Sequence, residues 1–365
     1  MRQITGQITQ EIQDFIGDEP LDRAEPYPVS TYRKLVEQVA KLAYLNKDYL
    51  LFFRGQGLDY RNRGGASTFY PTIYRGDYIQ VSEIKHRFRL LDEGAKSIRH
   101  IFEDQKIQGY TEFIWKKHVQ WSILQHYEVC NTPLFDLTHS LRVACSFAQM
   151  GASEGFGYVY VFGLPYVMNR ISHNSEHDLV NIRLLSICPP EALRPYFQEG
   201  YLAGTEDITD EYDSKDILDF RNRLIAKFRI PSQAKFWGDG FSQIPRAVLY
   251  PRNDRIEKLC NELNLELKAQ MLPGQLGEFL SEWTELEEYL LTTVRDQEER
   301  VISTSQAISH LLDTGSYDDE TANTLQELRK FRNVLVHEPK KISSEEVENR
   351  FEQLKQISKQ IRSPS

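Results

Sequence analysis

The pattern of apolar, glycine and proline residues changes at Pro273-Gly274, and this change constrains the fold more than any other feature of the sequence. Before this dipeptide, short apolar runs alternate with stretches rich in glycine and polar residues. After Gly277 a long stretch has neither glycine nor proline, and apolar residues recur every three or four positions, as on one face of a helix. A length of 365 residues suits two domains. We therefore predict an α+β domain over residues 1–272 and an all-α domain over residues 276–365.

The all-α part divides into four predicted helices. The first two lie in the stretch that follows Gly277. The third follows the turn at Gly315, has acidic residues in its first turn, and ends before Pro339. Ser343 or Ser344 caps the fourth, which has glutamates in its first turn. Four helices in so short a segment predict a small up-and-down bundle.

The N-terminal part mixes strands and helices. Leu50–Gln56 is predicted to be a buried strand. Tyr158–Phe162 is β-branched and aromatic and is predicted to be a strand by its composition. Helical spacing of apolar residues predicts two long helices, over Val81–Gln108 and Tyr110–Tyr127. Strands and helices mixed in one segment of this length indicate a single α+β domain.

Charge and cysteine usage restrict the partners and the compartment. The chain has 44 Lys and Arg residues against 53 Asp and Glu, a net charge of −9. Proteins that hold nucleic acid by bulk electrostatics are usually basic, so any such contact must use a local site. The four cysteines lie far apart without a CxxC, which argues against a disulfide framework and a structural zinc site. With no membrane-length apolar run and no secretory signal, we expect a reduced, cytoplasmic protein that contacts no membrane.

Three polar residues gather near the end of the third predicted helix of the all-α part: Arg332, Asn333 and His337. Asn333 and His337 are one turn apart on the same face. A histidine near a helix C-terminus can move protons, and an arginine can hold a phosphate. These groups suffice for metal-free RNA cleavage, in which a ribose 2′-hydroxyl attacks the adjacent phosphate. The alternative is that Arg332 forms a salt bridge while His337 caps the helix.

A second group of polar residues is predicted in the N-terminal domain. Arg54 ends the first strand, where a guanidinium can bind a phosphate or carboxylate. His126 ends a predicted helix, and a short strand over Leu134–Leu137 delivers Asp136 and Thr138 to one region. If that strand is half-buried, Asp136 needs a partner. The alternative is that Arg54 and Asp136 only brace the loop after the first strand.

The helical domain resembles the HEPN family, whose pattern is an arginine, four to six residues and a histidine on the third helix of a four-helix bundle. Arg332, Asn333 and His337 fit this pattern, and the resemblance covers about residues 276–361. Many HEPN proteins are ribonucleases of toxin and phage-defence systems. The resemblance implies RNA as the substrate, a reaction that needs no metal or cofactor, and a homodimer that builds the site across its two-fold axis.

The N-terminal domain resembles the FRG family over about residues 32–263. FFRGQ carries the Phe53-Arg54-Gly55 signature, and QHYEVCNTPLFDLTHSLRVACSFA and RPYFQEG are similar to the second and third family blocks. The sequence departs from the family at Glu128, usually glycine, and at Pro133, usually arginine. The missing arginine removes a cation from that loop.

The order of these motifs is similar to that of ADP-ribosyltransferases, in which an early arginine holds the phosphates of NAD. The resemblance implies an NAD or nucleotide site formed by Arg54, Gln56, His126, Asp136, Thr138 and Gln198. No ExE or QxE pair follows in the third block, and Glu199 on a strand would point away from Gln198.

Together the two resemblances predict an effector of the toxin or phage-defence type with a neutralising or triggering partner. The alternative is a sensing or interaction protein, in which the N-terminal pocket binds a nucleotide without turnover and the helical domain only dimerises.

Overall fold

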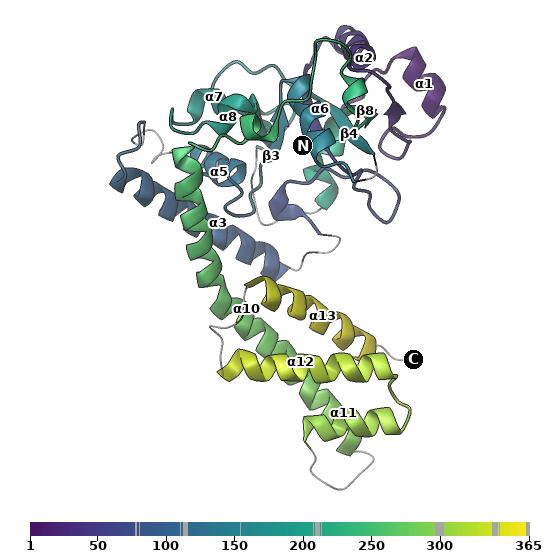
Figure 1. Ribbon diagram of the computed structural model, residues 1–365, viewed down its shortest axis with the longest axis vertical. Helices are drawn as coiled ribbons and strands as arrows, with labels where there is room; N and C mark the ends of the chain where they lie inside the picture. The colour runs from purple at the N-terminus through teal and green to yellow at the C-terminus, as the bar shows by residue number, and fades with distance from the viewer. Residues whose placement is uncertain are drawn as a thin grey trace. The chain divides into compact units, whose positions relative to one another are not determined.

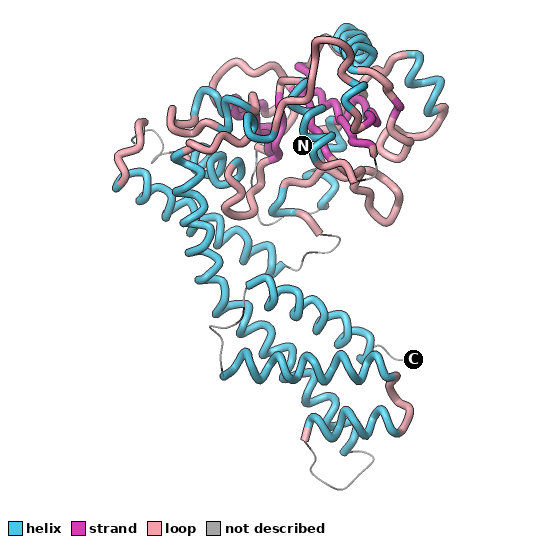
Figure 2. The backbone as a smooth tube through the Cα atoms, in the orientation of Figure 1, coloured by secondary structure: helices cyan, strands magenta, loops and turns pink. Residues whose placement is uncertain are grey.

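The chain forms two compact units, Met1–Asn264 and Leu265–Ser365. This computed structural model describes residues 1–76, 79, 81–109, 111, 116–153, 155–206, 208, 212, 214–295, 303–337, 342 and 344–362. Within these ranges, strands occur only in the first unit, and the second is helical (Figure 2). The mixed first part and helical second part agree with the fold class predicted from the sequence.

The first unit is built on a sheet of eight described strands. In order across the sheet they are β1 (Tyr27–Pro28), β8 (Leu224–Pro231), β4 (Phe156–Leu164), β2 (Leu50–Gln56), β3 (Phe135–Thr138), β7 (Gly200–Gly204), β6 (Leu179–Arg183) and β5 (Ile171–Asn174). β1 runs parallel to β8, and the other neighbours are antiparallel. The predicted strands at 50–56 and 158–162 are confirmed as β2 and the middle of β4.

Both faces of this sheet are buried. Alternate side chains of a strand point to opposite faces, so Phe53 and Val161 enter one apolar core while Phe52 and Phe162 enter another. Helix α6 packs directly on β2 and β4 (Figure 1). This burial on both faces explains why these strands read as nearly continuous apolar runs.

The described helices of the first unit lie between the strands. They are α1 (Gln10–Ile16), α2 (Tyr32–Leu45), α3 (Val81–Asp104), α5 (Lys117–His126), α6 (Leu141–Met150), α7 (Leu184–Ile187), α8 (Arg194–Phe197) and α9 (Arg246–Leu249). α3 ends four residues before the predicted Gln108, because Lys106 takes a left-handed φ of 52° that a helix cannot continue through. Part of the helix predicted from Tyr110 lies outside the described residues.

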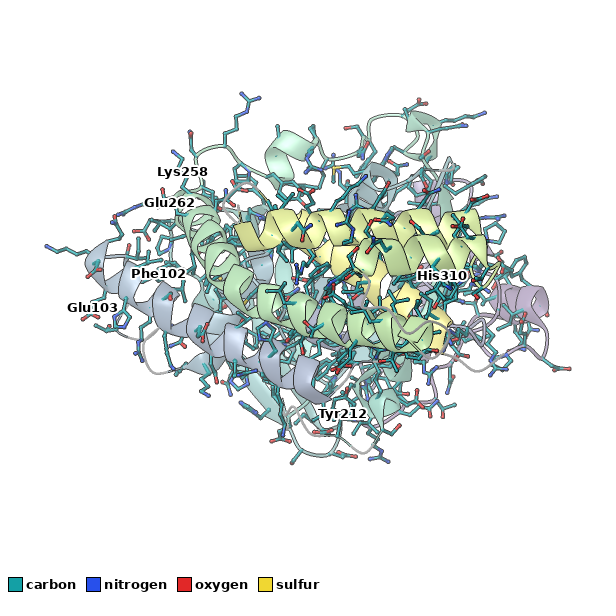
Figure 3. All side chains as sticks on the ribbon, turned by 90° about the horizontal axis from the view of Figure 1, so that it is seen from below. Phe102, Glu103, Tyr212, Lys258, Glu262 and His310 are labelled. Atoms are coloured by element: carbon teal, nitrogen blue, oxygen red, sulfur yellow. The ribbon has the colours of Figure 1, made fainter. Side chains whose placement is uncertain are left out.

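The second unit contains the end of a long helix and three further described helices. These are α10 (Arg255–Arg295), α11 (Thr304–Asp313), α12 (Asp319–His337) and α13 (Ser344–Arg362). α10 starts within the first unit, where Ile256 and Cys260 are buried and Lys258 and Glu262 lie on its outer face (Figure 3).

Pro273-Gly274 does not interrupt α10, so the prediction that this dipeptide separates two elements is wrong. A proline inside a helix costs about 3 kcal/mol, since it removes a hydrogen bond and crowds the preceding turn. Buried side chains anchor α10 in the core of the second unit, among them Phe279 and Trp283. Burial of such large side chains contributes more than the proline costs.

The second unit has its own apolar core, which takes up the apolar positions of α10 and α12. Trp283, Leu286 and Leu290 are fully buried in it, as are Leu325 and Leu328. Apolar side chains of the same helices also remain at the surface, since Tyr289 is 40% and Val334 42% exposed. Within the described residues, no helix combines the length and apolar character needed to cross a bilayer.

Candidate functional site

The sheet of the first unit opens between β2 and β3. β2 and β4 are paired over seven residues, whereas β2 and β3 share the single pair Phe53–Thr138. Beyond that pair the two strands diverge, so backbone groups on their facing edges lose their sheet partners. A cavity of ≈ 200 Å³ lies at this opening.

Arg54 closes the gap between the two strands. Its Nη1 donates to the backbone carbonyl of Asp136 at 2.7 Å, replacing a bond that a paired strand would supply. The guanidinium lies over the ring of Phe135, with 4.5 Å to the centroid. Burial lowers the pKa of Arg54 to about 10, so it remains a cation at neutral pH. The predicted bracing role is therefore present in the structure.

Two of the three nitrogens of that guanidinium are left for other contacts. Arg54 Nε is buried without a hydrogen-bond partner. Nη2 makes no hydrogen bond within the described part of the chain and is not buried. Since Arg54 lines the cavity, it can hold the loop and contact an anion at the same time.

Gly55 lets α6 approach this end of β2. A Cβ at position 55 would lie 1.8 Å from the carbonyl oxygen of Ala144 and 2.8 Å from the nitrogen of Ala148. Both alanines are fully buried on α6. The Arg-Gly pair therefore combines a cation at the cavity with a close contact between helix and strand.

Asp136 is held by the end of α5. Gln125 Nε2 donates to Asp136 Oδ2 in a short hydrogen bond, and His126 Nδ1 lies 3.8 Å from Oδ1. Burial alone would raise the pKa of Asp136, but His126, Arg54 and Gln125 stabilise the carboxylate and lower its pKa. The partner expected for Asp136 is thus His126 together with Gln125, while Arg54 binds the backbone of the same residue.

Thr138 and Gln198 contribute mainly to the frame of the cavity. The Thr138 hydroxyl donates to the carbonyl of Gln198 at 2.9 Å and accepts from Ser140 N at 3.1 Å. Gln198 is buried, and its Nε2 donates to the carbonyl of Leu249 at 2.8 Å. Both side chains line the cavity, and these bonds use the hydroxyl hydrogen of Thr138 and one of the two N–H donors of Gln198.

Gln198 is the C-cap of α8, and the assumption that Glu199 lies on a strand is wrong. Glu199 has a φ of 46°, the left-handed turn that leads from the helix into β7, which begins at Gly200. Gln56 is the last residue of β2, and its Oε1 is buried without a partner. It is not among the residues that line the cavity.

Arg194 is the cavity residue that sequence reasoning did not select. Its guanidinium lies against the rings of Tyr127 and Tyr250, at 5.2 and 4.7 Å, and pairs with Glu128 at 3.3 Å. The side chain is almost fully buried, and its Nε has no partner. Its one signal in the sequence is its place in the RPYFQEG block, and this place alone does not identify a site.

The backbone conformation at Glu128 shows how the chain accommodates one departure from the FRG pattern. Its φ of 57° is the left-handed conformation that glycine adopts without strain. The backbone of this chain therefore keeps the turn that the family's usual glycine would form. The glutamate side chain adds a carboxylate that pairs with Arg194 at the cavity.

In the second unit, Arg332 and Asn333 lie together on α12. Arg332 Nη1 donates to Asn333 Oδ1 at 3.1 Å, and Nη2 lies 3.9 Å from Glu287 Oε2. Arg332 Nε is buried without a partner. His337 is the last residue of α12, as expected, but its side chain lies outside the described residues. The ion pair with Glu287 is the salt bridge anticipated as the alternative role of Arg332.

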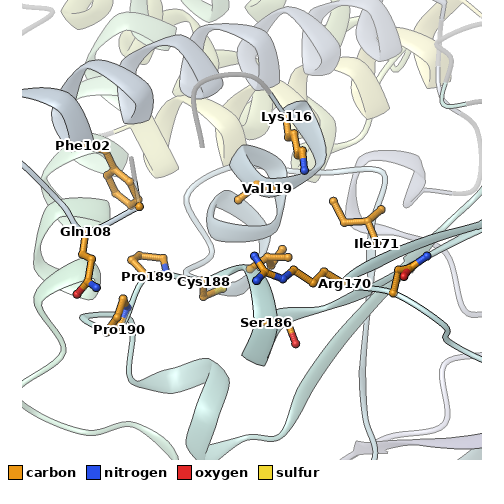
Figure 4. Close-up of a pocket in the computed structure, with 13 residues that line it drawn as sticks. Phe102, Gln108, Lys116, Val119, Arg170, Ile171, Ser186, Cys188, Pro189 and Pro190 are labelled. Atoms are coloured by element: carbon orange, nitrogen blue, oxygen red, sulfur yellow. The ribbon is translucent and has the colours of Figure 1, made fainter. Parts of the chain in front are cut away.

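Other hollows occur in the first unit. One of them, of ≈ 690 Å³, has Lys116 and Arg170 on its walls (Figure 4). Gly109 and Lys116 at its edge flank residues outside the described ranges. Within the described residues, no group of three His, Cys, Asp or Glu side chains is placed to hold a metal ion.

No family model, curated protein or solved structure matches this chain.

Proposed function

From these two sites, we propose that the chain is an effector of the toxin or phage-defence type. Its first unit, an FRG-like and ADP-ribosyltransferase-like domain, binds a nucleotide such as NAD. Its second unit, a HEPN-like four-helix domain, cleaves RNA without a metal ion. A single observation carries the first half: Arg54 Nε, His126 Nε2 and Arg194 Nε are all buried without a partner, and all three residues line one cavity.

Unpartnered buried nitrogens are costly, at about 1–3 kcal/mol each, so their gathering around one cavity favours a polar ligand there. Arg54 and Arg194 suit a phosphate, and the Asp136 carboxylate suits the hydroxyls of a ribose. The rings of Phe147 and Tyr250, 6.2 Å apart, supply an aromatic wall. At ≈ 200 Å³ the cavity is below the roughly 300–1,000 Å³ of most ligand sites. We therefore expect it to enclose only one phosphoribosyl end of a dinucleotide.

Calorimetric titration of the full chain with NAD and with ADP-ribose tests this half. Arg54→Lys keeps the charge but cannot bond the Asp136 carbonyl and an anion together, so binding should weaken about tenfold. Arg33→Lys, an exposed arginine on α2, is the control and should bind as the wild type. Absence of heat with both nucleotides would count against the site. Chromatography of NAD after incubation then separates turnover from binding alone.

The ribonuclease half is carried by the pairing of Arg332 with Asn333 one turn before the end of α12. In the proposed reaction, His337 takes the proton of a ribose 2′-hydroxyl and the freed oxygen attacks the neighbouring phosphorus. Arg332 neutralises the phosphate, and the 5′-oxygen leaves with the bond electrons and takes up a proton. The products are a 2′,3′-cyclic phosphate and a 5′-hydroxyl.

Incubation of total RNA with the protein in the presence of chelator tests cleavage. Arg332→Ala and His337→Ala should each abolish it. Arg329→Ala is the matched control, because Arg329 lies on the same helix and bonds Gln326 at 3.0 Å. If the wild type leaves diverse RNAs intact, the second unit is not a ribonuclease, and the sensing or dimerising role becomes the better description.

A further inference from the structure

A second hollow lies behind the cavity, on the opposite face of the sheet. Phe53, Thr138 and Gly200 are paired across β2, β3 and β7 and line the cavity. Their chain neighbours Phe52, His139 and Tyr201 line a separate hollow of ≈ 370 Å³. Because neighbouring residues of a strand point to opposite faces, the sheet itself is the wall between the two. A ligand in the cavity cannot reach this hollow.

The floor of this hollow is aromatic. The exposed ring of His139 lies against Phe52, with centroids 4.9 Å apart and an interplanar angle of 35°. Tyr201 closes the group at 5.0 Å from Phe52 and 5.6 Å from His139. Burial lowers the pKa of His139, so it offers a neutral ring face at neutral pH. Phe52 is only 1% exposed and supports the two other rings from below, so His139 and the half-buried Tyr201 are the rings that a nucleobase can reach.

The rim of the hollow is cationic. Arg170 and Arg183 are both exposed, and their backbones are joined by a hydrogen bond of 2.9 Å. Arg183 makes no ion pair or side-chain hydrogen bond within the described part of the chain. Asp and Glu are absent from the described lining, although the chain as a whole carries a net charge of −9. Local positive charge on an acidic protein indicates selection for an anionic ligand at this place.

This hollow adjoins the larger one described above. Asn169, Arg170 and Ser186 border both this hollow and the larger one beside it, and Figure 4 shows Arg170 and Ser186 from that side. We propose that His139 and Tyr201, supported from below by Phe52, form with Arg170 and Arg183 a binding platform for single-stranded RNA. Bases stack on the accessible rings of His139 and Tyr201, and the guanidinium groups contact successive phosphates. This inference goes beyond the proposed function, since neither the nucleotide cavity nor the ribonuclease site takes part in it.

Fluorescence anisotropy with a labelled single-stranded RNA of mixed sequence tests the platform. The full chain carrying His337→Ala is used, so that cleavage does not interfere. His139→Ala and Arg183→Gln should each weaken binding about tenfold, and Arg183→Gln should also reduce the salt slope by about 0.7. Arg252→Gln, which removes another exposed arginine of the first unit, is the control and should change neither value.

Equal losses in Arg252→Gln would mean that binding is bulk electrostatics, and the proposal would be wrong. Stronger competition by an acidic peptide than by unlabelled RNA would also overturn it, in favour of a protein partner. RNA binding by a chain that never cleaves RNA would leave the platform standing and remove the ribonuclease. Cleavage that persists in His139→Ala and Arg183→Gln chains that retain His337, together with unchanged RNA binding by the two variants, would remove the platform and leave the ribonuclease standing.

Discussion

At the scale of single residues, Gly55 has the least freedom to change. An alanine there would place its Cβ 1.8 Å from the Ala144 carbonyl oxygen, so α6 or β2 would have to move. We expect Gly55→Ala to lower the free energy of unfolding by about 3 kcal/mol, the upper end of the range for an overpacked core. Gly277→Ala is the control, because Gly277 lies in α10 with no atom within 4 Å of its added Cβ. That change should stabilise by roughly 0.5–1 kcal/mol. Urea titration of both variants decides this.

Asp136 should leave a signature in the pH dependence of stability. Its pKa is lower in the folded protein than in the unfolded chain. The stabilising contribution is therefore complete above about pH 3.9 and is lost as the pH falls through the folded-state pKa. Asp136→Asn should flatten the fall in urea midpoint below about pH 4. Asp239→Asn, at an exposed position, should follow the wild-type curve. Parallel curves for wild type and Asp136→Asn would contradict the assignment.

The chemical type of the site residues could be predicted from sequence, but their hydrogen bonds could not. Arg54, His126 and Asp136 come from distant segments and line one cavity. That Arg54 binds the backbone carbonyl of Asp136, and that Gln125 holds the carboxylate, depends on how far β2 and β3 diverge. No spacing along the chain encodes that divergence.

At the scale of elements, two variants of Glu128 in the turn after α5 allow the effect of backbone strain to be measured separately from the effect of charge. Glu128 has a φ of 57°, which costs a residue with a side chain about 1 kcal/mol relative to glycine. Glu128→Gly should therefore raise the free energy of unfolding by that amount and remove one of the two carboxylates that pair with Arg194, leaving Glu257 at 3.7 Å. Glu128→Gln removes the same charge but keeps the strain. Both should strengthen ADP-ribose binding, whereas only Glu128→Gly should raise the melting temperature. An unchanged affinity in both would remove Arg194 from the ligand site.

The contact between α10 and α12 distinguishes the two roles of Arg332. Glu287 lies 3.9 Å from its Nη2 and also accepts a hydrogen bond from Thr304. Glu287→Gln keeps an acceptor for Thr304 but removes the charge that competes with phosphate. If Arg332 binds RNA, KM for RNA should fall several-fold, since a partly exposed ion pair holds at most about 1 kcal/mol. If the pair is only structural, the melting temperature falls and KM stays the same.

The spacing of apolar residues predicted that most helices and strands exist. It did not predict where they end, because their ends depend on tertiary contacts. β2 and β4 lie where the apolar and aromatic runs placed them. Pro273-Gly274 failed as a boundary because burial on α10 outweighs a local penalty. Gln198 and Glu199 were misplaced on a strand because four-residue helices such as α8 are too short to show a helical period.

At the scale of the whole molecule, the expected homodimer now depends on the HEPN resemblance and on one exposed residue. The core of the second unit buries most apolar side chains of α10 and α12. Val334 remains 42% exposed, next to Asn333 on α12. If two copies share the ribonuclease site, this valine lies at their interface, because the site residues surround it in sequence.

Val334→Glu should then convert a dimer to a monomer in light scattering and abolish RNA cleavage in the same variant. A charge placed in a desolvated interface is strongly unfavourable, whereas the same charge on a free surface costs little. Val36→Glu is the matched control, since Val36 on α2 is also 42% exposed. It should change neither the mass nor the cleavage. A monomeric wild type, or a Val334→Glu variant that stays dimeric and active, would exclude a shared site and leave Arg332 and His337 to act within one chain.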